Sequence, residues 1–124
     1  MGFSAGAGSC AAVARDYPQI SRMLLLAPAE DVGREAIDNG LGSFGGWVYI
    51  FIGSHDEVVG SVSGRRFYDR AVSASHRELY EIPGCDHQFS SRANGIFLSK
   101  IPIYAFWQGE RLTGFSCVPS IELY

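Results

Sequence analysis

The sequence predicts an α/β fold in which a partial parallel sheet of three to four strands is flanked by helices. Short apolar runs alternate along the chain with helix-like stretches, an order typical of a parallel sheet with covering helices. The 124 residues are enough for a single domain, 1–124, and 47% of them are hydrophobic, which is sufficient to build a core.

Three apolar runs carry the predicted strands. Arg22–Ala27 is almost continuously apolar and ends at Pro28, as expected for a strand buried on both faces. Trp47–Ile52 contains only aromatic and β-branched residues and is the strongest strand candidate. Arg77–Ile82 alternates weakly before Pro83 and Gly84, which favours a strand near the sheet edge.

Four segments between and after these strands have helical spacing or composition. They are Ser9–Asp16, Glu30–Leu41, Ser63–Ser73 and Asn94–Trp107. In the last of them, Pro102 lacks a backbone N–H and is expected to kink or interrupt the helix. Residues 112–124 show no clear period.

Composition excludes several classes of function. Ten basic residues face thirteen acidic ones, and the net charge of −3 argues against a nucleic-acid partner. No apolar run approaches the roughly 20 residues of a membrane span, and no secretory leader is evident. The three cysteines, Cys10, Cys85 and Cys117, have no metal-ligand spacing and suggest reduced thiols in the cytoplasm.

A nucleophile motif stands at the start of the chain. Gly2-Phe3-Ser4-Ala5-Gly6 matches G-x-S-x-G, in which a serine occupies a sharp strand-to-helix turn and the glycines make room for the backbone. The Ala5 N–H would then help to bind the oxyanion of a tetrahedral intermediate. A plain glycine-rich turn is the simpler interpretation of this motif taken alone.

Two further residues strengthen the catalytic interpretation. Asp56 follows the strand Trp47–Ile52, and His87 follows the strand Arg77–Ile82 after a short loop. Loops at the carboxyl ends of parallel strands converge, so Ser4, Asp56 and His87 are expected to meet there. Their order, Ser then Asp then His, is the one that accompanies G-x-S-x-G.

With these three motifs the chain resembles the C-terminal half of an α/β-hydrolase of the dienelactone-hydrolase, lipase and esterase kind. The resemblance extends from Gly2 to about Trp107. It implies that Ser4 is the nucleophile, His87 the base, Asp56 the acid and Ala5 an oxyanion donor, and it implies no cofactor. A metal site is conceivable by residue type, but the spacing matches no known ligand motif and no metal is predicted; the residues are His55, Asp56, Glu57, Asp86 and His87.

The chain also departs from that family. Four strands precede the serine-bearing strand in the family, whereas only Met1 precedes Gly2 here. The strand that anchors the serine and the loop that supplies a second oxyanion donor are therefore expected to be missing. We expect a truncated α/β-hydrolase-like domain with weak or no activity on its own, and an open sheet edge that invites self-association.

Simpler interpretations of the individual residues remain open. Ser4 could be only a residue at a helix N-terminus, and Asp56 could serve only to satisfy backbone N–H groups. Asp31, which also follows a predicted strand, is the alternative acid.

Two other functions compete with hydrolysis. The chain could be a non-catalytic module that pairs its open sheet edge with a partner. Gly6-Ala7-Gly8-Ser9-Cys10-Ala11 also fits the dinucleotide fingerprint G-x-G-x-x-A, with Glu30 as the ribose-binding acid. That fingerprint requires a strand before its first glycine and leaves Asp56 and His87 unexplained.

The sequence therefore predicts a serine hydrolase acting on a small-molecule ester or related acyl compound. Asp31–Gly46 is expected to contribute to the pocket, and Phe3, Trp47 and Phe89 are candidate apolar contacts to the substrate. The identity of the substrate does not follow from these residues.

Overall fold

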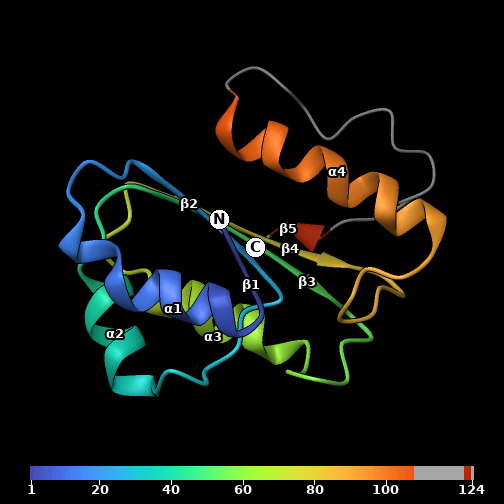
Figure 1. Ribbon diagram of the computed structural model, residues 1–124, viewed down its shortest axis with the longest axis horizontal. Helices are drawn as coiled ribbons and strands as arrows, with labels where there is room; N and C mark the ends of the chain where they lie inside the picture. Colours follow the sequence, from blue (N-terminus) through green and yellow to red (C-terminus); the bar gives the residue numbers. More distant parts are fainter. Residues whose placement is uncertain (108–121, 124) are drawn as a thin grey trace.

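Four strands lie side by side in chain order and form a parallel sheet, β1-β2-β3-β4 (Figure 1). The strands are β1 (Gly2–Phe3), β2 (Arg22–Leu26), β3 (Trp47–Gly53) and β4 (His76–Ile82). A short strand β5 (Glu122–Leu123), which the sequence did not predict, pairs antiparallel with β4. The computed structural model describes residues 1–107, 122 and 123. The predicted α/β class is confirmed, with four strands in the parallel part of the sheet.

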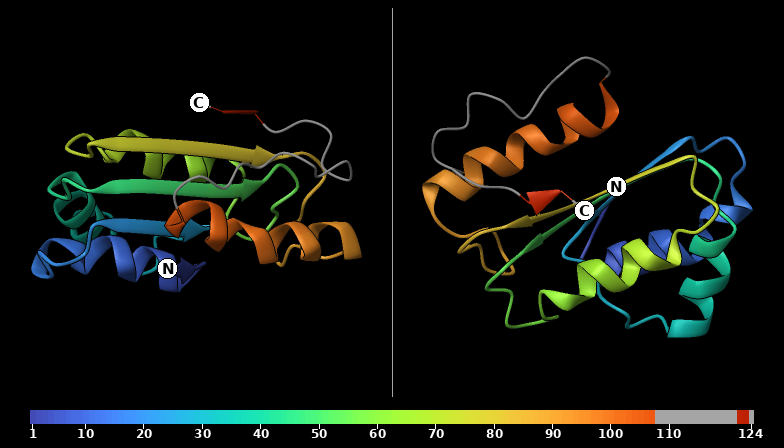
Figure 2. Two further views of the ribbon diagram at one scale, coloured as in Figure 1. Left: turned by 90° about the horizontal axis from the view of Figure 1, so that it is seen from above. Right: turned by 180° about the vertical axis from the view of Figure 1, so that it is seen from behind.

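Helices cover both faces of the sheet. On one face lie α1 (Ala5–Val13), which continues into a single 3₁₀ turn (Ala14–Asp16), α2 (Arg34–Gly42) and α3 (Val62–Arg70). The opposite face is covered by α4 (Arg92–Phe106) (Figures 1 and 2). The result is a three-layer arrangement, with the sheet in the middle.

Strand β3 supplies side chains to both cores. Val48, Ile50 and Ile52 point toward α1–α3 and join the larger cluster. Tyr49 and Phe51 point the other way, into the cluster beneath α4. A strand buried on both faces needs no polar alternation, which is why Trp47–Ile52 was readable as a strand from its apolar run alone.

Strand β1 corrects the expectation that no strand anchors the serine. Gly2 and Phe3 pair with Leu25 and Leu26, and the Ser4 N–H continues the ladder by donating to the Leu26 carbonyl at 2.9 Å. A strand of two residues has no period in the sequence, so pattern analysis could not detect it.

Two helices also differ from their predicted form. Helix α1 begins at Ala5, four residues before the predicted start, because the glycine-rich stretch is already helical after Ser4. Helix α4 continues through Pro102 instead of being interrupted there. Proline removes one N–H and its ring crowds the preceding turn, yet packing of Phe97, Ile101 and Ala105 against the sheet holds the helix in place.

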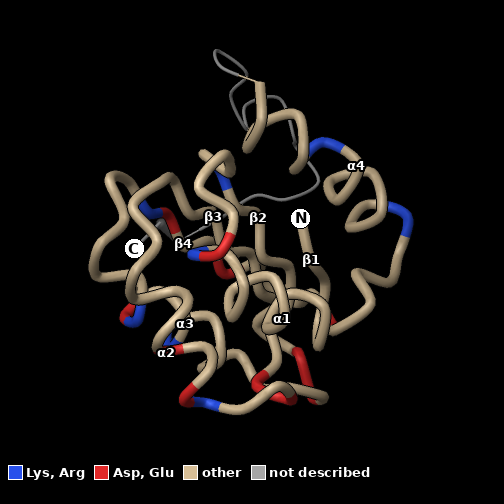
Figure 3. The backbone as a smooth tube through the Cα atoms, turned by 60° about the vertical axis from the view of Figure 1, so that its left-hand side comes forward, with Lys and Arg blue, Asp and Glu red and all other residues tan. Residues whose placement is uncertain are grey.

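Charged side chains are distributed unevenly over these layers. Helix α4 carries Arg92 and Lys100 and no acidic residue (Figure 3). On the other face Glu30 forms ion pairs with Arg34, Arg66 and Arg70, which link the loop after β2 to α2 and α3. Among the described residues, no helix is long and apolar enough to cross a membrane.

Candidate active site

The carboxyl ends of β1, β3 and β4 bring Ser4, Asp56 and His87 together. His87 Nδ1 lies 2.7 Å from Asp56 Oδ2, and His87 Nε2 lies 3.0 Å from Ser4 Oγ. Because the strands are parallel, segments that are 31 and 83 residues apart in the chain end at a common edge. The three side chains form one continuous hydrogen-bonded line from carboxylate to hydroxyl.

Ser4 occupies a strained turn between β1 and α1. Its backbone has φ 55° and ψ −122°, a conformation that residues other than glycine rarely adopt. Backbone hydrogen bonds hold it there, since the Ser4 carbonyl accepts from the N–H groups of Ala7 and Ala29, both at 3.0 Å. The turn leaves Ser4 partly exposed and directs its hydroxyl to the imidazole of His87.

The two glycines of the motif are not equivalent. A Cβ atom on Gly2 would lie 2.6 Å from the Gly6 carbonyl oxygen, so the close approach of strand and helix requires glycine at position 2. A Cβ atom on Gly6 would meet nothing within 4 Å among the described residues. The expectation that both glycines make room for this turn is therefore wrong for Gly6.

Asp56 is fixed by the loop that follows it. Its Oδ1 accepts hydrogen bonds from the N–H groups of Val58, at 3.0 Å, and Val59, at 2.9 Å, which leaves Oδ2 for the imidazole. The residue is 4% exposed. Asp56 therefore does both things that the sequence left as alternatives: it satisfies backbone N–H groups and it contacts His87.

The loop carrying Asp56 is tied to the loop carrying His87. The His55 N–H donates to the Cys85 carbonyl at 2.9 Å, and the Gly84 N–H donates to Ser54 Oγ at 2.7 Å. The loops cross so closely that a Cβ atom on Gly53 would lie 2.1 Å from the Cys85 oxygen. These contacts fix the acid and the base relative to each other before any ligand binds.

The geometry assigns separate tasks to the two nitrogens of His87. A carboxylate can only accept, so Nδ1 carries a proton and donates it to Asp56. Nε2 is then free to accept from the Ser4 hydroxyl. The imidazole is 6% exposed and its ring centroid lies 5.0 Å from that of Phe3, which shields it on one side.

The backbone N–H of Ala5 is available at the same place. Ala5 is the first residue of α1, and the first N–H groups of a helix lack intrahelical acceptors. The helix dipole adds a partial positive charge at this end. An oxyanion formed on a group attached to Ser4 would be stabilised by both features.

None of Asp31, Asp86, His55 and His76 belongs to the hydrogen-bonded line from Asp56 to Ser4. Asp31 is exposed and lines a different pocket, described below. The Asp86 carboxylate accepts from the Ser90 N–H at 2.7 Å, and this hydrogen bond lowers the pKa of Asp86. His55 is exposed, and His76 pairs with Glu78.

Neither Cys10 nor Cys85 belongs to the hydrogen-bonded line from Asp56 to Ser4. Burial, with smaller effects from Asp86 and Asp56, raises the pKa of Cys85 to about 12, so its thiol stays protonated at neutral pH. Cys10 is a free, partly buried thiol, and Cys117 lies outside the described residues. Residues 1–107 contain no group of three or more His, Cys, Asp or Glu side chains that could hold a metal ion.

The three predicted substrate contacts do not lie together. Phe3 and Phe89 line the same apolar pocket, and in the chain they lie one residue from Ser4 and two residues from His87. Trp47 is the first residue of β3, in register with Arg22 and His76, and so lies at the amino-terminal edge of the sheet. There the Arg22 guanidinium lies 4.6 Å from its ring centroid. The prediction for Trp47 is corrected: parallel strands place their first residues at the edge opposite the triad.

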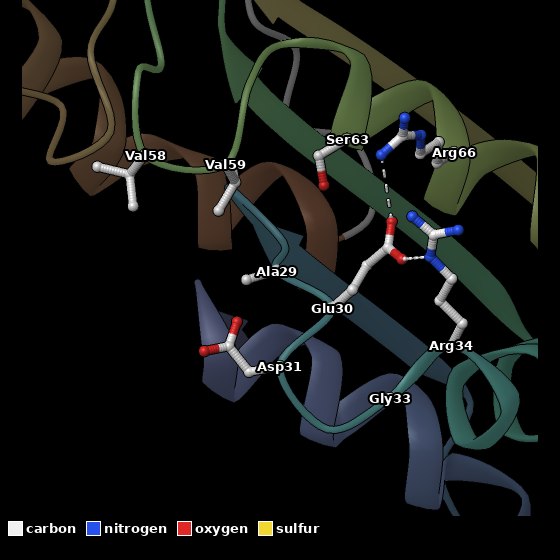
Figure 4. A pocket seen from close by; sticks show the side chains of 9 residues that line it. All are labelled: Ala29, Glu30, Asp31, Gly33, Arg34, Val58, Val59, Ser63 and Arg66. Atoms are coloured by element: carbon white, nitrogen blue, oxygen red, sulfur yellow. Dashed lines mark hydrogen bonds and ion pairs between the residues drawn. The ribbon is translucent and has the colours of Figure 1, made fainter.

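A second, charged pocket of about 530 Å³ opens between the loop after β2 and α3 (Figure 4). Glu30 stands in it between Arg34 and Arg66. Burial opposes the charged form of Glu30, but hydrogen bonds and charge from Arg70 and Arg34 outweigh it and lower its pKa. The lining of this charged pocket includes Asp31 but not Ser4, Asp56 or His87. The segment Asp31–Gly46 was expected to contribute to the substrate pocket. It contributes to this charged pocket and not to the immediate surroundings of Ser4, Asp56 and His87.

The dinucleotide interpretation gains no support from these positions. Gly6 and Gly8 lie inside the first turns of α1, not in a loop between strand and helix. Glu30 is held by arginines, where a ribose would need a free carboxylate.

Several residues that shape the site carried no sequence signal. The Val58 and Val59 amides that hold Asp56, and the apolar side chains of Leu26 and Leu98 near Phe3, are ordinary residues in ordinary contexts. Gly53 is the last residue of β3 and lies just before the loop that carries Asp56. It was the one sequence feature that indicated a close approach of two loops there.

Comparison with known proteins places the fold. No protein-family model and no curated protein matches the sequence. The esterase domain of a Rhodothermus marinus protein matches with a TM-score of 0.70 over 81% of this chain and 55% of that chain, at 14% identity. A predicted CIB-like hydrolase from Thermoplasma acidophilum matches with a TM-score of 0.62 over 80% of this chain and 45% of that one, at 20% identity.

Both of these structures are of the α/β-hydrolase type. The chain therefore has the fold of part of an α/β-hydrolase, as its resemblance to the C-terminal half implied, and it spans about half the length of the two structures.

Proposed function

We propose that this chain carries the catalytic centre of a serine hydrolase that cleaves an ester or related acyl compound. The observation that carries the proposal is the continuous line from Asp56 through His87 to Ser4 on a strained turn. Two solved structures with this fold are described as an esterase domain and a predicted hydrolase, which agrees with that chemistry.

Acylation begins at the Ser4 hydroxyl. As Oγ attacks the substrate carbonyl, His87 Nε2 accepts the hydroxyl proton and Asp56 stabilises the resulting imidazolium through Nδ1. The carbonyl oxygen becomes an oxyanion that the Ala5 N–H binds. Collapse of the intermediate breaks the bond to the leaving alcohol, which takes the proton from His87 Nε2.

Deacylation repeats the same steps with water. His87 Nε2 accepts a proton from the water that attacks the acyl group on Ser4, and then returns a proton to Ser4 Oγ. The acid leaves and the starting state is restored. Every proton in this cycle moves through one nitrogen, so the orientation set by Asp56 matters in both halves.

We expect the chain by itself to be a slow enzyme. The described residues offer one assigned oxyanion donor, Ala5, and the loss of a single donor costs about 10²–10³ in kcat in a known serine hydrolase. A strained turn such as that of Ser4 also depends on its surroundings, and β1 contacts only one neighbouring strand in the described sheet.

Hydrolysis of p-nitrophenyl acetate, with intact-mass detection of the acyl-enzyme, tests the proposal. We expect an acetyl group on Ser4, and no acylation in Ser4→Ala. Ser99→Ala, which removes an exposed serine on α4, is the matched control and should leave acylation unchanged. Acylation that survives in Ser4→Ala, or a wild-type chain never acylated at Ser4, would contradict the proposal.

A second proposal concerns the free edge of β1. In the described sheet β1 is the terminal strand. Phe3, which belongs to β1, is 45% exposed, and Met1, which precedes it, is 66% exposed. We propose that this edge pairs with a second copy of the chain. Sedimentation equilibrium should then show a dimer that a proline at position 3 disrupts, whereas a monomer at every concentration would contradict the pairing.

A further inference from the structure

An apolar pocket adjoins the proposed nucleophile. It has a volume of about 320 Å³ and its apolar lining comes from β1, β2, the loop after β4 and helix α4. These residues are Met1, Phe3, Leu26, Phe89, Leu98 and Pro102. The only other lining residue is Gln88. The volume of this apolar pocket falls at the lower end of the range for small-molecule pockets, roughly 300–1,000 Å³.

Chain geometry places this apolar pocket next to Ser4 and His87. Phe3 immediately precedes Ser4, and its ring lies 5.0 Å from the imidazole. The Leu26 carbonyl accepts a hydrogen bond from the Ser4 N–H, and Phe89 follows His87 by two residues. A group bonded to Ser4 Oγ can therefore extend directly between β1 and α4.

His87 itself lines a second, polar pocket. This polar pocket has a volume of about 500 Å³, and among its other lining residues are His55, Glu57, Asp86 and Asn94. The lining contains two carboxylates and neither lysine nor arginine. Gln88 lines both pockets and so stands at their boundary.

We infer that the site takes esters that join an apolar acyl chain to a polar alcohol that is uncharged or cationic. The inference rests on the proposed function, because the chemistry decides which half of the ester lies where. When Ser4 Oγ bonds to the carbonyl carbon and the carbon–oxygen bond to the alcohol breaks, the acyl half stays on Ser4, beside the apolar pocket. The alcohol leaves with the proton of His87 Nε2, on the side of the polar pocket.

Chain length measures the acyl half of this inference. Each methylene that moves from water into the apolar pocket should tighten binding about fourfold, until the pocket is full. The alcohol half follows from charge: Glu57 and Asp86 disfavour an anionic alcohol, and the lining contains no lysine or arginine to offset them.

Binding can be measured without catalysis in Ser4→Ala protein. Methyl ketones from 2-butanone to 2-decanone are neutral, uncleavable mimics of the acyl half, and their affinities follow from NMR titration. We expect each added methylene to lower the dissociation constant about fourfold at first. Leu98→Trp fills the pocket and should remove this length dependence, whereas Ile96→Trp, on the same helix but outside the lining, should keep it.

Ketone binding tests the apolar pocket, and acylation of Ser4 tests the proposed function, so the two can fail separately. Affinity that does not change with chain length overturns the acyl assignment, even if Ser4 is acylated in the wild-type chain. Length-dependent binding without acylation of Ser4 supports the pocket and contradicts the proposed function. If Leu98→Trp does not fold, Leu98→Gln replaces it and should weaken the longest ketone at least about tenfold.

A second copy of the chain is the rival occupant of the apolar pocket. If ketone binding and dimerisation compete in sedimentation runs, the pocket is an interface between copies and the acyl assignment is overturned. Independence of the two supports the assignment.

Discussion

Among the described residues, two pairs of histidine and carboxylate stand out, one at each edge of the sheet. At the carboxyl edge His87 Nδ1 lies 2.7 Å from Asp56, and at the amino edge His76 Nε2 lies 2.5 Å from Glu78. Both carboxylates are buried, yet only the first pair has a neighbouring nucleophile. The difference between the two edges shows what a catalytic pair requires beyond the pair itself.

At the amino edge the carboxylate is used by other groups. Glu78 Oε1 accepts hydrogen bonds from the hydroxyls of Tyr80 and Tyr104, while Oε2 faces His76. Burial opposes the charge, but hydrogen bonds from Tyr104, Tyr80 and His76 outweigh it and lower the pKa of Glu78. Burial and the bond to Glu78 raise the pKa of Tyr104 to about 12. This cluster joins α4 to β4.

His76 itself is placed for packing. Its ring lies 4.5 Å from that of Trp47, and it is exposed to solvent. By contrast, His87 is buried, its second nitrogen meets Ser4, and it lines the polar pocket, while Phe3, whose ring contacts it, lines the apolar pocket. A strained turn that presents a hydroxyl, and pockets beside it, therefore distinguish the carboxyl edge of the sheet from the amino edge.

Replacing each histidine gives the largest expected contrast. His87→Ala removes the proposed base and should lower kcat/KM for a p-nitrophenyl ester by at least about 10³-fold. His76→Ala should change it less than about twofold, because that ring reaches no reacting group. Comparable losses in the two variants would contradict the division between the edges.

Replacing each carboxylate by its amide gives the second contrast. Asp56→Asn keeps an oxygen for the Val58 and Val59 amides but presents the wrong partner to Nδ1, and should cost up to about 10⁴-fold in kcat. The same change at Glu78 should leave kcat within about twofold. Steady-state kinetics of the two amide variants checks both values, with circular dichroism to show that each is folded.

The structural pair should reveal itself in stability. Glu78→Gln disrupts the hydrogen bonds of the buried Tyr80 and the half-buried Tyr104 and should lower the free energy of unfolding by about 1–3 kcal/mol at neutral pH. Because the pKa of Glu78 is lowered on folding, its stabilising effect is full above the ordinary value of 4.5 and is lost as pH falls through the folded-state value.

Urea titrations at several pH values measure this effect. The wild-type and Glu78→Gln curves should therefore converge in acid. A difference that stays constant from neutral pH to acid would show that the carboxylate charge has no part in it.

The smallest expected effect concerns the strain at Ser4. Ser4→Gly and Ser4→Ala both lack the hydroxyl, but glycine accepts φ 55° without steric cost. Ser4→Gly should therefore be more stable than Ser4→Ala by about 1 kcal/mol. Ser99→Gly, inside α4, should instead be less stable than Ser99→Ala by about the same amount. Thermal unfolding of the four variants gives both differences.

The sequence predicted the sheet well where strands are long and apolar. Trp47–Ile52 and Arg22–Ala27 were recognisable because both faces are buried, and Asp56 and His87 could be placed because they follow strands. Strand β1 was not recognisable, since two residues carry no period and its identity depends on pairing with Leu25 and Leu26.

The surroundings of the triad were less predictable. Trp47 was assigned to the substrate because it is aromatic and near a functional strand, but its position at the start of β3 puts it at the other edge. Leu98 and Pro102 enter the apolar pocket only because α4 crosses that face of the sheet. Such neighbours follow from tertiary packing, which a single sequence does not encode in local patterns.

Labelling by an alkyl fluorophosphonate, located by peptide mass spectrometry, tests the central claim most directly. These reagents phosphonylate an activated serine and so report the line from Asp56 through His87 to Ser4 without requiring turnover. We expect label on Ser4 in the wild-type chain and in His76→Ala, and none in His87→Ala. Unlabelled Ser4 in the folded wild-type chain, or label that persists in His87→Ala, would contradict it.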